Sequence, residues 1–353
     1  MTQKRTGSGI NPRLAERLRQ RTELPPPEEL LTALKAGDRS ALSRAITLVE
    51  SDLERHREQA NRLVDAAGGS AGHSIRIGIT GSPGVGKSSF IEALGRWLIE
   101  RGHRVAVLAI DPSSPVSHGS ILGDKTRMQE LSRLPGAFVR PSPAGSELGG
   151  VARRTRETML LCEAAGYDVI LVETVGVGQS ETTVRSLVDC FLLLLLPGAG
   201  DELQGIKRGI VEMADLVAIN KADGDRLRLA KETKRAYRDS LHLFPAAAST
   251  WTPRVLLCSA LEGTGLEEVW QNISDYRKMT EENGFFARQR QEQNIHWLRR
   301  TLDDRLRRLF TDDEQSREAL TRYEAAVRDG SISPFSAAER LVGQFLENLK
   351  RKP

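Results

Sequence analysis

The chain has 353 residues, enough for one α/β domain of about 200 residues and a smaller helical part. Apolar residues make up 39% and charged residues 28%, a balance that excludes a largely disordered chain. The net charge of +4 is small for this length and no basic run is interleaved with aromatic residues, so we expect no nucleic-acid partner. The apolar run at 190–196 is too short to span a bilayer, so we expect no membrane association.

The N-terminal part of the chain is predicted to contain an extension and a helical region. Residues 1–28 lack the apolar core of a secretory signal, so we expect a flexible extension of a cytoplasmic protein. Residues 29–73 carry leucines at helical spacing and are predicted to form an N-terminal helical region. Asp38 or Ser40 is expected to cap its second helix.

Residues 74–275 are predicted to form an α/β domain. Seven short apolar runs alternate there with helical stretches, a pattern typical of a mostly parallel sheet with helices on both faces. The predicted strands are IRIGIT, RVAVLAI, AFVR, DVILVE, CFLLLLL, DLVAIN and RVLLCS. The three cysteines stand apart in apolar surroundings without metal-binding spacing, so we expect reduced core thiols at Cys162, Cys190 and Cys258.

Residues 276–353 are predicted to form long charged helices with two apolar stripes. These stripes either pack on the sheet domain or on each other, or they form a dimerisation arm. The first stripe is Ile295, Leu298, Leu302, Leu306 and Leu309, and the second, after Pro334, is Phe335, Ala338, Leu341, Val342, Phe345 and Leu349.

A phosphate-binding loop follows the first predicted strand directly. Residues 81–88 read GSPGVGKS, a full match to GxxxxGK[ST] between a strand and a helix. Its glycines let backbone N–H groups curl around phosphates, Lys87 bridges the terminal phosphates, and the Ser88 hydroxyl binds Mg²⁺. The residues predicted to bind the nucleotide here are Gly81, Ser82, Pro83, Gly84, Val85, Gly86, Lys87, Ser88 and Ser89.

Three acidic residues are candidate partners of that metal ion. Glu173 ends a predicted strand, and the carboxyl end of a neighbouring parallel strand faces the same crevice as the phosphate loop. Asp111 also follows a strand, and Asp124 lies in the loop ILGDKTRM. We therefore predict Mg²⁺ bound by Ser88, Asp111, Asp124 and Glu173, with turn formation and helix capping as the alternative for the two aspartates.

A second loop predicts which base is bound. The tetrapeptide NKAD at 220–223 follows the strand DLVAIN, and SAL at 259–261 follows the last strand. One ionised carboxylate accepts hydrogen bonds from both the imino and the amino N–H groups of guanine, a pair that adenine lacks, so Asp223 is predicted to select GTP. Lys221 lies over the base, Asn220 ties this loop to the phosphate loop, and a backbone N–H from the SAL loop reaches the guanine oxygen. The predicted base-binding residues are Asn220, Lys221, Asp223, Ser259, Ala260 and Leu261.

Six motifs in chain order resemble the MeaB/ArgK/MMAA family of GTPases associated with methylmalonyl-CoA mutase. This family is a branch of the P-loop GTPases that also includes the metallochaperone GTPases for hydrogenase and urease. The likeness covers the chain from about residue 29 to the C-terminus. The motifs are GSPGVGKSS, AIDPSSPVSHGSILGDKTRM, VETVGVGQSE, PGAGDELQGIKRG, NKADGD and CSALEGTG.

The resemblance implies a Mg²⁺-dependent GTPase with a P-loop GTPase sheet and a C-terminal helical dimerisation arm at 276–353. It implies a chaperone of an adenosylcobalamin-dependent acyl-CoA mutase that gates cofactor loading and protects or reactivates the mutase. It also implies a homodimer, with the adenosyltransferase as a further candidate partner. No motif in the chain indicates that it holds cobalamin itself.

The resemblance also implies three switch segments, at 111–128, 173–182 and 201–209, with Lys207 connecting the third to the nucleotide. For hydrolysis we predict catalytic roles for Lys87, Glu173 and Lys207, and for Gln179 in positioning the attacking water. No arginine can be assigned to stabilise the transition state, which predicts slow intrinsic turnover accelerated by a partner. The unassigned arginine candidates are Arg127, Arg153, Arg154 and Arg156.

Two other functions compete with the mutase chaperone. A nickel-type metallochaperone would need a cluster of thiolates or imidazoles at ligand spacing, and His118 is the only histidine near the predicted site. An ATP-dependent kinase of a transport protein is an older label attached to the family, and the NKAD loop argues against it.

Overall fold

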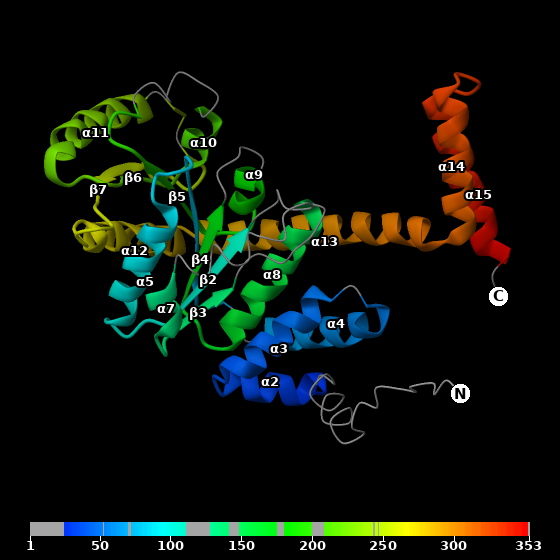
Figure 1. The fold of residues 1–353 in the computed structure, drawn as a ribbon, viewed down its shortest axis with the longest axis horizontal. Coiled ribbons are helices and arrows are strands. Elements are labelled where there is room, and N and C mark those ends of the chain that lie inside the picture. Colours follow the sequence, from blue (N-terminus) through cyan, green and yellow to red (C-terminus); the bar gives the residue numbers. More distant parts are fainter. Residues whose placement is uncertain are drawn as a thin grey trace, which may run out of the picture. The chain divides into compact units, whose positions relative to one another are not determined.

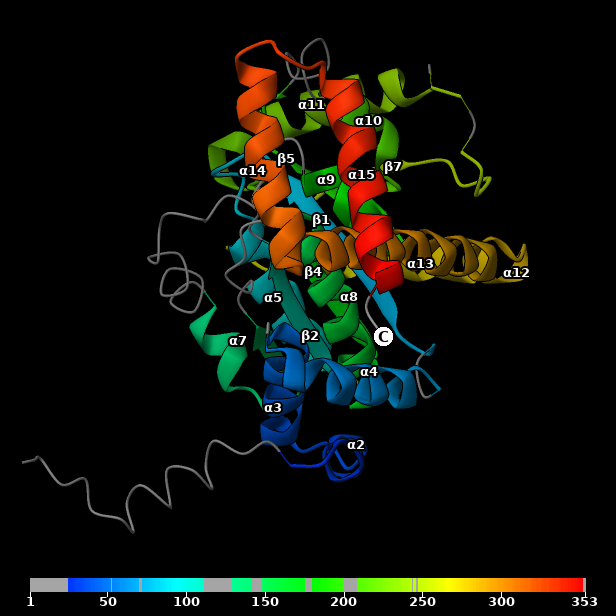
Figure 2. The same ribbon diagram turned by 90° about the vertical axis from the view of Figure 1, so that its right-hand side faces the viewer.

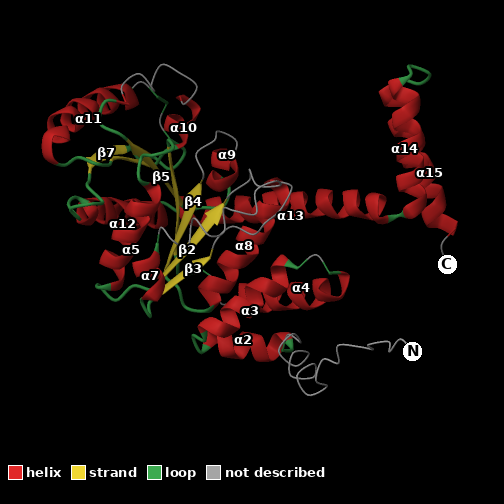
Figure 3. Ribbon diagram, in the orientation of Figure 1, coloured by secondary structure: helices red, strands yellow, loops and turns green. Residues whose placement is uncertain are grey.

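The computed structural model of the protein describes residues 25–51, 53–69, 72–110, 128–140, 148–174, 180–199, 208–242, 244–245 and 247–351. The chain divides into two compact units, Met1–Arg290 and Gln291–Pro353. The first unit contains a sheet covered by helices on both faces (Figure 1, Figure 3). Among the described residues, no helix combines the length and apolar composition needed to cross a membrane.

The sheet has seven strands in the order β3-β2-β4-β1-β5-β6-β7, and every described strand pair is parallel. All seven predicted runs form strands, so the predicted α/β fold class is confirmed. Strands β1, β4 and β5 are buried along their whole length, as expected of continuous apolar runs in the middle of a parallel sheet. The strands are β1 (Ile75–Gly81), β2 (Val105–Ile110), β3 (Ala137–Arg140), β4 (Val169–Thr174), β5 (Cys190–Leu195), β6 (Leu216–Ile219) and β7 (Arg254–Leu257).

Helices connect these strands and extend beyond them at both ends of the chain. Their bounds are α2 (Pro27–Lys35), α3 (Arg39–Glu50), α4 (Glu54–Gly68), α5 (Lys87–Ile99), α7 (Gln129–Arg133), α8 (Leu148–Ala164), α9 (Ser180–Arg185), α10 (Arg208–Met213), the 3₁₀ turn η2 (Gly224–Arg226), α11 (Leu227–Leu241), α12 (Leu266–Glu282), α13 (Phe285–Asp312), α14 (Glu314–Arg328) and α15 (Pro334–Arg351).

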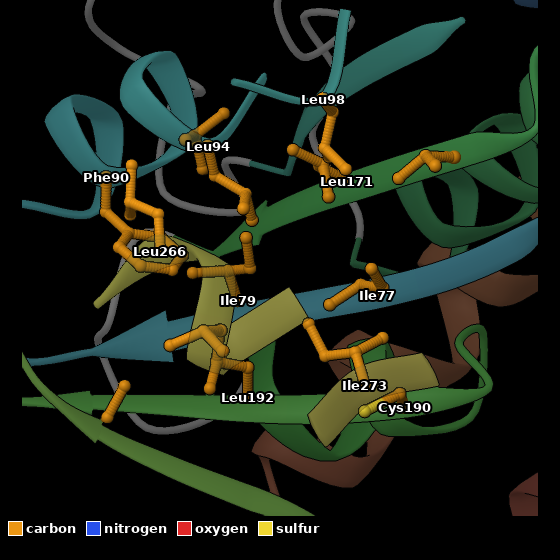
Figure 4. Packing of buried hydrophobic residues seen from close by; sticks show 14 of the residues in the cluster. Ile77, Ile79, Phe90, Leu94, Leu98, Leu171, Cys190, Leu192, Leu266 and Ile273 are labelled. Carbon is orange, nitrogen blue, oxygen red and sulfur yellow. The ribbon is translucent and has the colours of Figure 1, made fainter. Parts of the chain in front are cut away.

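Helices α5 and α12 cover one face of the sheet. Figure 4 shows Phe90 and Leu94 of α5 and Ile273 of α12 among the strand residues of this core. Helices α10 and α11 contribute to a second buried cluster with β5, β6 and β7 that includes Leu193, Val217 and Tyr237. Burial of a large apolar side chain stabilises the fold by about 1.5–3 kcal/mol, so these two layers hold the strand ends in fixed positions.

The N-terminal helices α2, α3 and α4 pack on one another and on α8 (Figure 2). Asp38 is the residue that caps α3, because its carboxylate accepts hydrogen bonds from the Ser40 and Ala41 amides. Such a cap typically contributes about 1 kcal/mol. The apolar spacing predicted for this region matches the buried side chains of α3, which include Leu42 and Ile46.

A buried network of charges holds the start of β1. The Arg76 guanidinium donates to both carboxylate oxygens of Glu163 in α8, over 2.8 and 2.9 Å. The Arg290 guanidinium in α13 donates to both oxygens of Asp189, over 2.8 and 2.6 Å. Asp189 also accepts from the Arg76 amide at 2.8 Å. The first turns of α13 are therefore fixed to the edge of the sheet at which β1 and β5 begin.

The second unit, residues 291–353, contains most of α13 together with α14 and α15. Phe310 and Phe345 meet edge to face at 5.3 Å between ring centroids. The first apolar stripe, from Ile295 to Leu309, is solvent-exposed in this structure, and Leu298 is 70% exposed. Within the described part of the chain, the stripe is therefore left uncovered.

Candidate functional site

The phosphate loop begins at the end of β1, in the middle of the sheet between β4 and β5. Gly86 precedes α5 in a left-handed conformation with φ 93°. The Lys87 ammonium donates to the backbone oxygens of Gly81 and Ser82, over 2.8 and 3.3 Å, and its side chain is buried. The loop thus folds around its own lysine at the N-terminus of α5, where helix amides without intrahelical acceptors attract phosphate.

Two glycines are required by close contacts in this loop. A Cβ atom on Gly86 would lie 2.8 Å from Nδ2 of Asn220, and one on Gly81 would lie 2.5 Å from the backbone oxygen of Leu194. Both glycines also have positive φ, which other residues adopt only with strain. Glycine here therefore allows the loop to approach both β5 and the base-recognition loop.

Ser88 and Glu173 meet beside the loop. Glu173 lies in register with Ile79 of β1, two residues before the phosphate loop begins. The Ser88 hydroxyl donates to Oε1 of Glu173 at 2.9 Å, although the two residues are 85 positions apart. A hydroxyl and a carboxylate side by side are hard oxygen donors of the kind that Mg²⁺ prefers, so these residues fit a magnesium ion.

Asn220 and Lys221 join the NKAD loop to the phosphate loop. Asn220 Nδ2 donates to the backbone oxygen of Val85 at 2.9 Å, and Lys221 Nζ donates to that of Gly84 at 2.8 Å. Lys221 is one of two described non-glycine residues with positive φ, at 60°. Strain of this kind, held by surrounding contacts, often occurs at functional sites.

The loop after β7 completes the base-recognition region. The Ser259 hydroxyl donates to Oδ2 of Asp223, and the Ala260 amide donates to Oδ1 of Asn220 at 3.1 Å. The Leu261 side chain is 90% exposed beside these groups. The Ala260 amide therefore already has an acceptor in this structure.

A pocket of about 440 Å³ opens between α5, the NKAD loop and the loop after β7. Gly86 and Ser89 line it at the phosphate end, and Asp223 and Leu261 line it at the base end. This size and mixture of backbone, charged and apolar groups suit a nucleotide.

Some predicted residues lie outside the described residues. These are Asp111, Asp124, Gln179 and Lys207, together with Arg127 and His118. Among the described residues, no group of three or more His, Cys, Asp or Glu side chains is arranged to hold a metal ion.

The structure changes the interpretation of Arg156, which the sequence left as either a catalytic or a surface residue. Its side chain is buried, and burial, with a smaller contribution from Arg76, lowers the pKa of Arg156 to about 10. The charges around it include Arg76 and Glu163, beside the first residues of β1, whereas the phosphate loop follows the last residue of that strand. Arg156 is therefore a buried residue beside this charge network rather than a surface residue.

Sequence reasoning also missed contacts and residues of this region. The hydroxyl of Ser259 bonds to Asp223, whereas only a backbone role was expected for the SAL loop. Glu92, Arg96 and Glu130 line the pocket but carry no motif signal, because α5 and α7 show only ordinary amphipathic spacing.

Comparison with known proteins supports one family. The family described as "Methylmalonyl Co-A mutase-associated GTPase MeaB" matches residues 42–315. The chain is 47% identical to "GTPase ArgK" of Escherichia coli, over 90% of this chain and 96% of that protein. It is 44% identical to "Methylmalonic aciduria type A homolog, mitochondrial" of Mus musculus, over 90% of this chain and 79% of that protein.

A solved structure titled "LAO/AO transport system kinase" is also similar. It superimposes with a TM-score of 0.70 at 40% identity, and the match covers 91% of this chain and 97% of that chain. The protein is therefore a GTPase and belongs to the MeaB family of methylmalonyl-CoA mutase-associated GTPases.

Proposed function

We propose that this GTPase is the chaperone of an adenosylcobalamin-dependent acyl-CoA mutase of the methylmalonyl-CoA type. In this role it gates loading of the cofactor into the mutase and protects or reactivates the mutase. The observation that carries the proposal is the family match, which spans residues 42–315 and so includes the whole sheet domain. The adenosyltransferase that supplies the cofactor is a further candidate partner.

The base-recognition region supports GTP as the nucleotide. Asp223 lines the pocket, and the Ser259 hydroxyl donates to one of its two carboxylate oxygens. A carboxylate held in this way accepts hydrogen bonds from the N–H groups of guanine and meets no matching pair on adenine. This argues against an ATP-dependent kinase.

We propose that Mg²⁺ binds at Ser88 and Glu173, with Asp111 and Asp124 as further ligands. The contact between the Ser88 hydroxyl and Glu173 supports this assignment. The ion would neutralise part of the phosphate charge. Lys87 binds the terminal phosphates, Gln179 orients the attacking water, and Lys207 links the third switch to the nucleotide.

The exposed stripe of α13 supports a homodimer in which residues 276–353 form the dimerisation arm. Leu298, Leu302 and Leu306 recur at steps of four on one face, and each is more than half exposed. Contiguous exposed apolar surface of this kind marks an interaction site.

We further propose that the protein acts in the cytoplasm. We also propose that the 28-residue N-terminal extension and the helical region at 29–73 precede the GTPase domain at 74–275. Fractionation of the source cells tests this compartment.

The mutase proposal is tested by GTP hydrolysis with purified components. We expect slow single-turnover hydrolysis by the protein alone and faster hydrolysis when the methylmalonyl-CoA mutase of the same organism is added. With a non-hydrolysable GTP analogue, the two proteins should co-elute in size-exclusion chromatography. An unchanged rate together with separate elution would contradict the proposal, and recovery of a hydrogenase or urease subunit from extract would favour a metallochaperone.

A further inference from the structure

One wall of the nucleotide pocket has no role in phosphate or base recognition. Beyond Ser89 at the phosphate end, this wall is formed by one face of α5, where Glu92, Ala93 and Arg96 line the pocket at helical spacing, and by Glu130 of α7. Phosphate recognition involves the N-terminal end of α5, and base recognition involves the loops after β6 and β7. Neither phosphate nor base recognition therefore accounts for the charged side chains of this wall.

The covalent order of a nucleotide indicates what faces this wall. The ribose lies between the phosphates and the base in any nucleotide bound with its phosphates at Gly86 and its base at Asp223. Glu92 is three residues beyond Ser89, about 4.5 Å along the helix axis, on the same face of α5. Glu92 is thus the first charged side chain that this wall of α5 presents past the phosphate end.

Glu92 is held in place and retains an acceptor. Its Oε1 atom accepts hydrogen bonds from the amides of Glu130, at 3.1 Å, and Leu131, at 3.4 Å. Its Oε2 atom accepts no hydrogen bond from any residue in the described part of the chain. The side chain is half-buried, so its fixed geometry reduces the entropy lost when a ligand binds.

We infer that Glu92 recognises the ribose of the nucleotide, through a hydrogen bond that its carboxylate accepts from the sugar hydroxyls. A carboxylate serves the ribose hydroxyls in the same way in dinucleotide-binding folds. The consequence is discrimination between ribonucleoside and deoxyribonucleoside triphosphates, because the deoxy sugar leaves the carboxylate without its donor. This inference rests on the proposed GTP site and adds sugar specificity to it.

The test compares dissociation constants for GTP, 2′-deoxy-GTP and 3′-deoxy-GTP, measured by isothermal titration calorimetry on the full chain. We expect the unaltered protein to bind GTP about tenfold more tightly than at least one of the deoxy analogues. Glu92→Ala should lose this preference because its binding of GTP is weakened. Its dissociation constant for that deoxy analogue should stay within about twofold of the value for the unaltered protein. Glu92→Gln, which keeps an acceptor for the two amides, should retain a preference of only about threefold.

The control is Glu100→Ala, an exposed glutamate at the C-terminal end of the same helix and outside the pocket, which should retain the full preference. If Glu92 only anchors α7, Glu92→Ala should weaken the binding of all three nucleotides equally and leave the ratios of their dissociation constants unchanged. That result would overturn the inference. The inference also fails if the unaltered protein binds GTP and both deoxy analogues equally. ATP is titrated alongside these nucleotides, and failure to prefer GTP over ATP would instead overturn the proposed GTP site.

Discussion

Asp223 illustrates how a single residue depends on its neighbours for its chemistry. One of its carboxylate oxygens accepts a hydrogen bond from Ser259, 36 positions later in the chain. This contact orients the carboxylate before any nucleotide arrives. A preorganised acceptor binds a matching pair of donors more tightly than a mobile one, because less side-chain entropy is lost.

Replacement of this carboxylate should change the base preference. We expect Asp223→Asn to weaken GTP binding by about 2 kcal/mol, roughly thirtyfold in Kd, because an amide cannot accept from both guanine N–H groups. The variant should gain affinity for xanthosine triphosphate, whose extra carbonyl accepts from the new amide. Calorimetric titration measures both, and unchanged GTP affinity would show that the base pocket is elsewhere.

The three cysteines lie in the core, as the sequence predicts. All three are buried and free, and burial raises the pKa of Cys258 from 9.0 to about 12. Burial also raises the pKa values of the Cys162 and Cys190 thiols. Thiols in such positions are poor nucleophiles at neutral pH.

This burial predicts both a reactivity and a pH dependence. At pH 8 the native protein should leave all three thiols unreacted with a thiol-specific dye, and all three should react after denaturation. The pKa of Cys258 is higher in the folded protein than in the unfolded chain. The contribution of this buried, neutral thiol to the free energy of unfolding is therefore complete below about pH 9 and declines as the pH rises towards 12. Rapid reaction of the native protein would contradict this prediction.

At the scale of elements, the junction between β1 and α5 depends on a glycine. Gly86→Ala would force a Cβ atom to within 2.8 Å of the Asn220 amide and would strain a backbone with φ 93°. We expect a loss of about 1–3 kcal/mol of stability and a large loss of GTP affinity, since the phosphate loop and the NKAD loop would separate. The control is Gly343→Ala in the interior of α15, where the new Cβ meets no atom within 4 Å; it should leave GTP affinity unchanged and raise stability by about 0.5–1 kcal/mol, the usual gain of alanine over glycine in a helix.

The attachment of α13 to the sheet is also testable. Arg290→Ala would leave Asp189 buried without its ion-pair partner, so we expect the free energy of unfolding to fall by about 3–5 kcal/mol. The matched control is Arg238→Ala in an exposed pair with Asp239, which should cost less than about 1 kcal/mol. Urea unfolding measures both, and equal effects would mean that the buried pair does not stabilise the protein.

At the scale of the whole molecule, the exposed stripe of α13 predicts assembly. We expect the protein to sediment as a dimer and the double variant Leu298→Glu, Leu302→Glu to sediment as a monomer, because charges would have to be buried in the interface. Arg299→Glu, at an exposed position next to the stripe, should leave the dimer intact. A monomeric parent protein, or a double variant that remains dimeric, would contradict the proposed arm.

Particular residues show where sequence-based prediction stopped. Arg76 sits in the apolar run IRIGIT, and its partner Glu163 lies 87 positions away, so no local pattern could have indicated that this charge is buried. The sequence left Arg156 as either a catalytic or a surface residue for the same reason, because the charges around it include Arg76 and Arg290, which are distant in the chain. The exposure of the α13 stripe was also undecided, since helical spacing indicates an apolar face without indicating what covers it.

The sequence by itself determined the strands, the phosphate loop at 81–89 and the NKAD loop, because each depends on contiguous residues whose backbone preferences and spacing act locally. It also predicted that Glu173 emerges near Ser88, because parallel strands end at the same edge of a sheet. The tertiary structure alone decided that Ser259 orients Asp223, that Arg156 is buried, and that Glu92 lines the pocket. These contacts join residues brought together by strand order and packing, and their free energies depend on burial that a linear pattern does not specify.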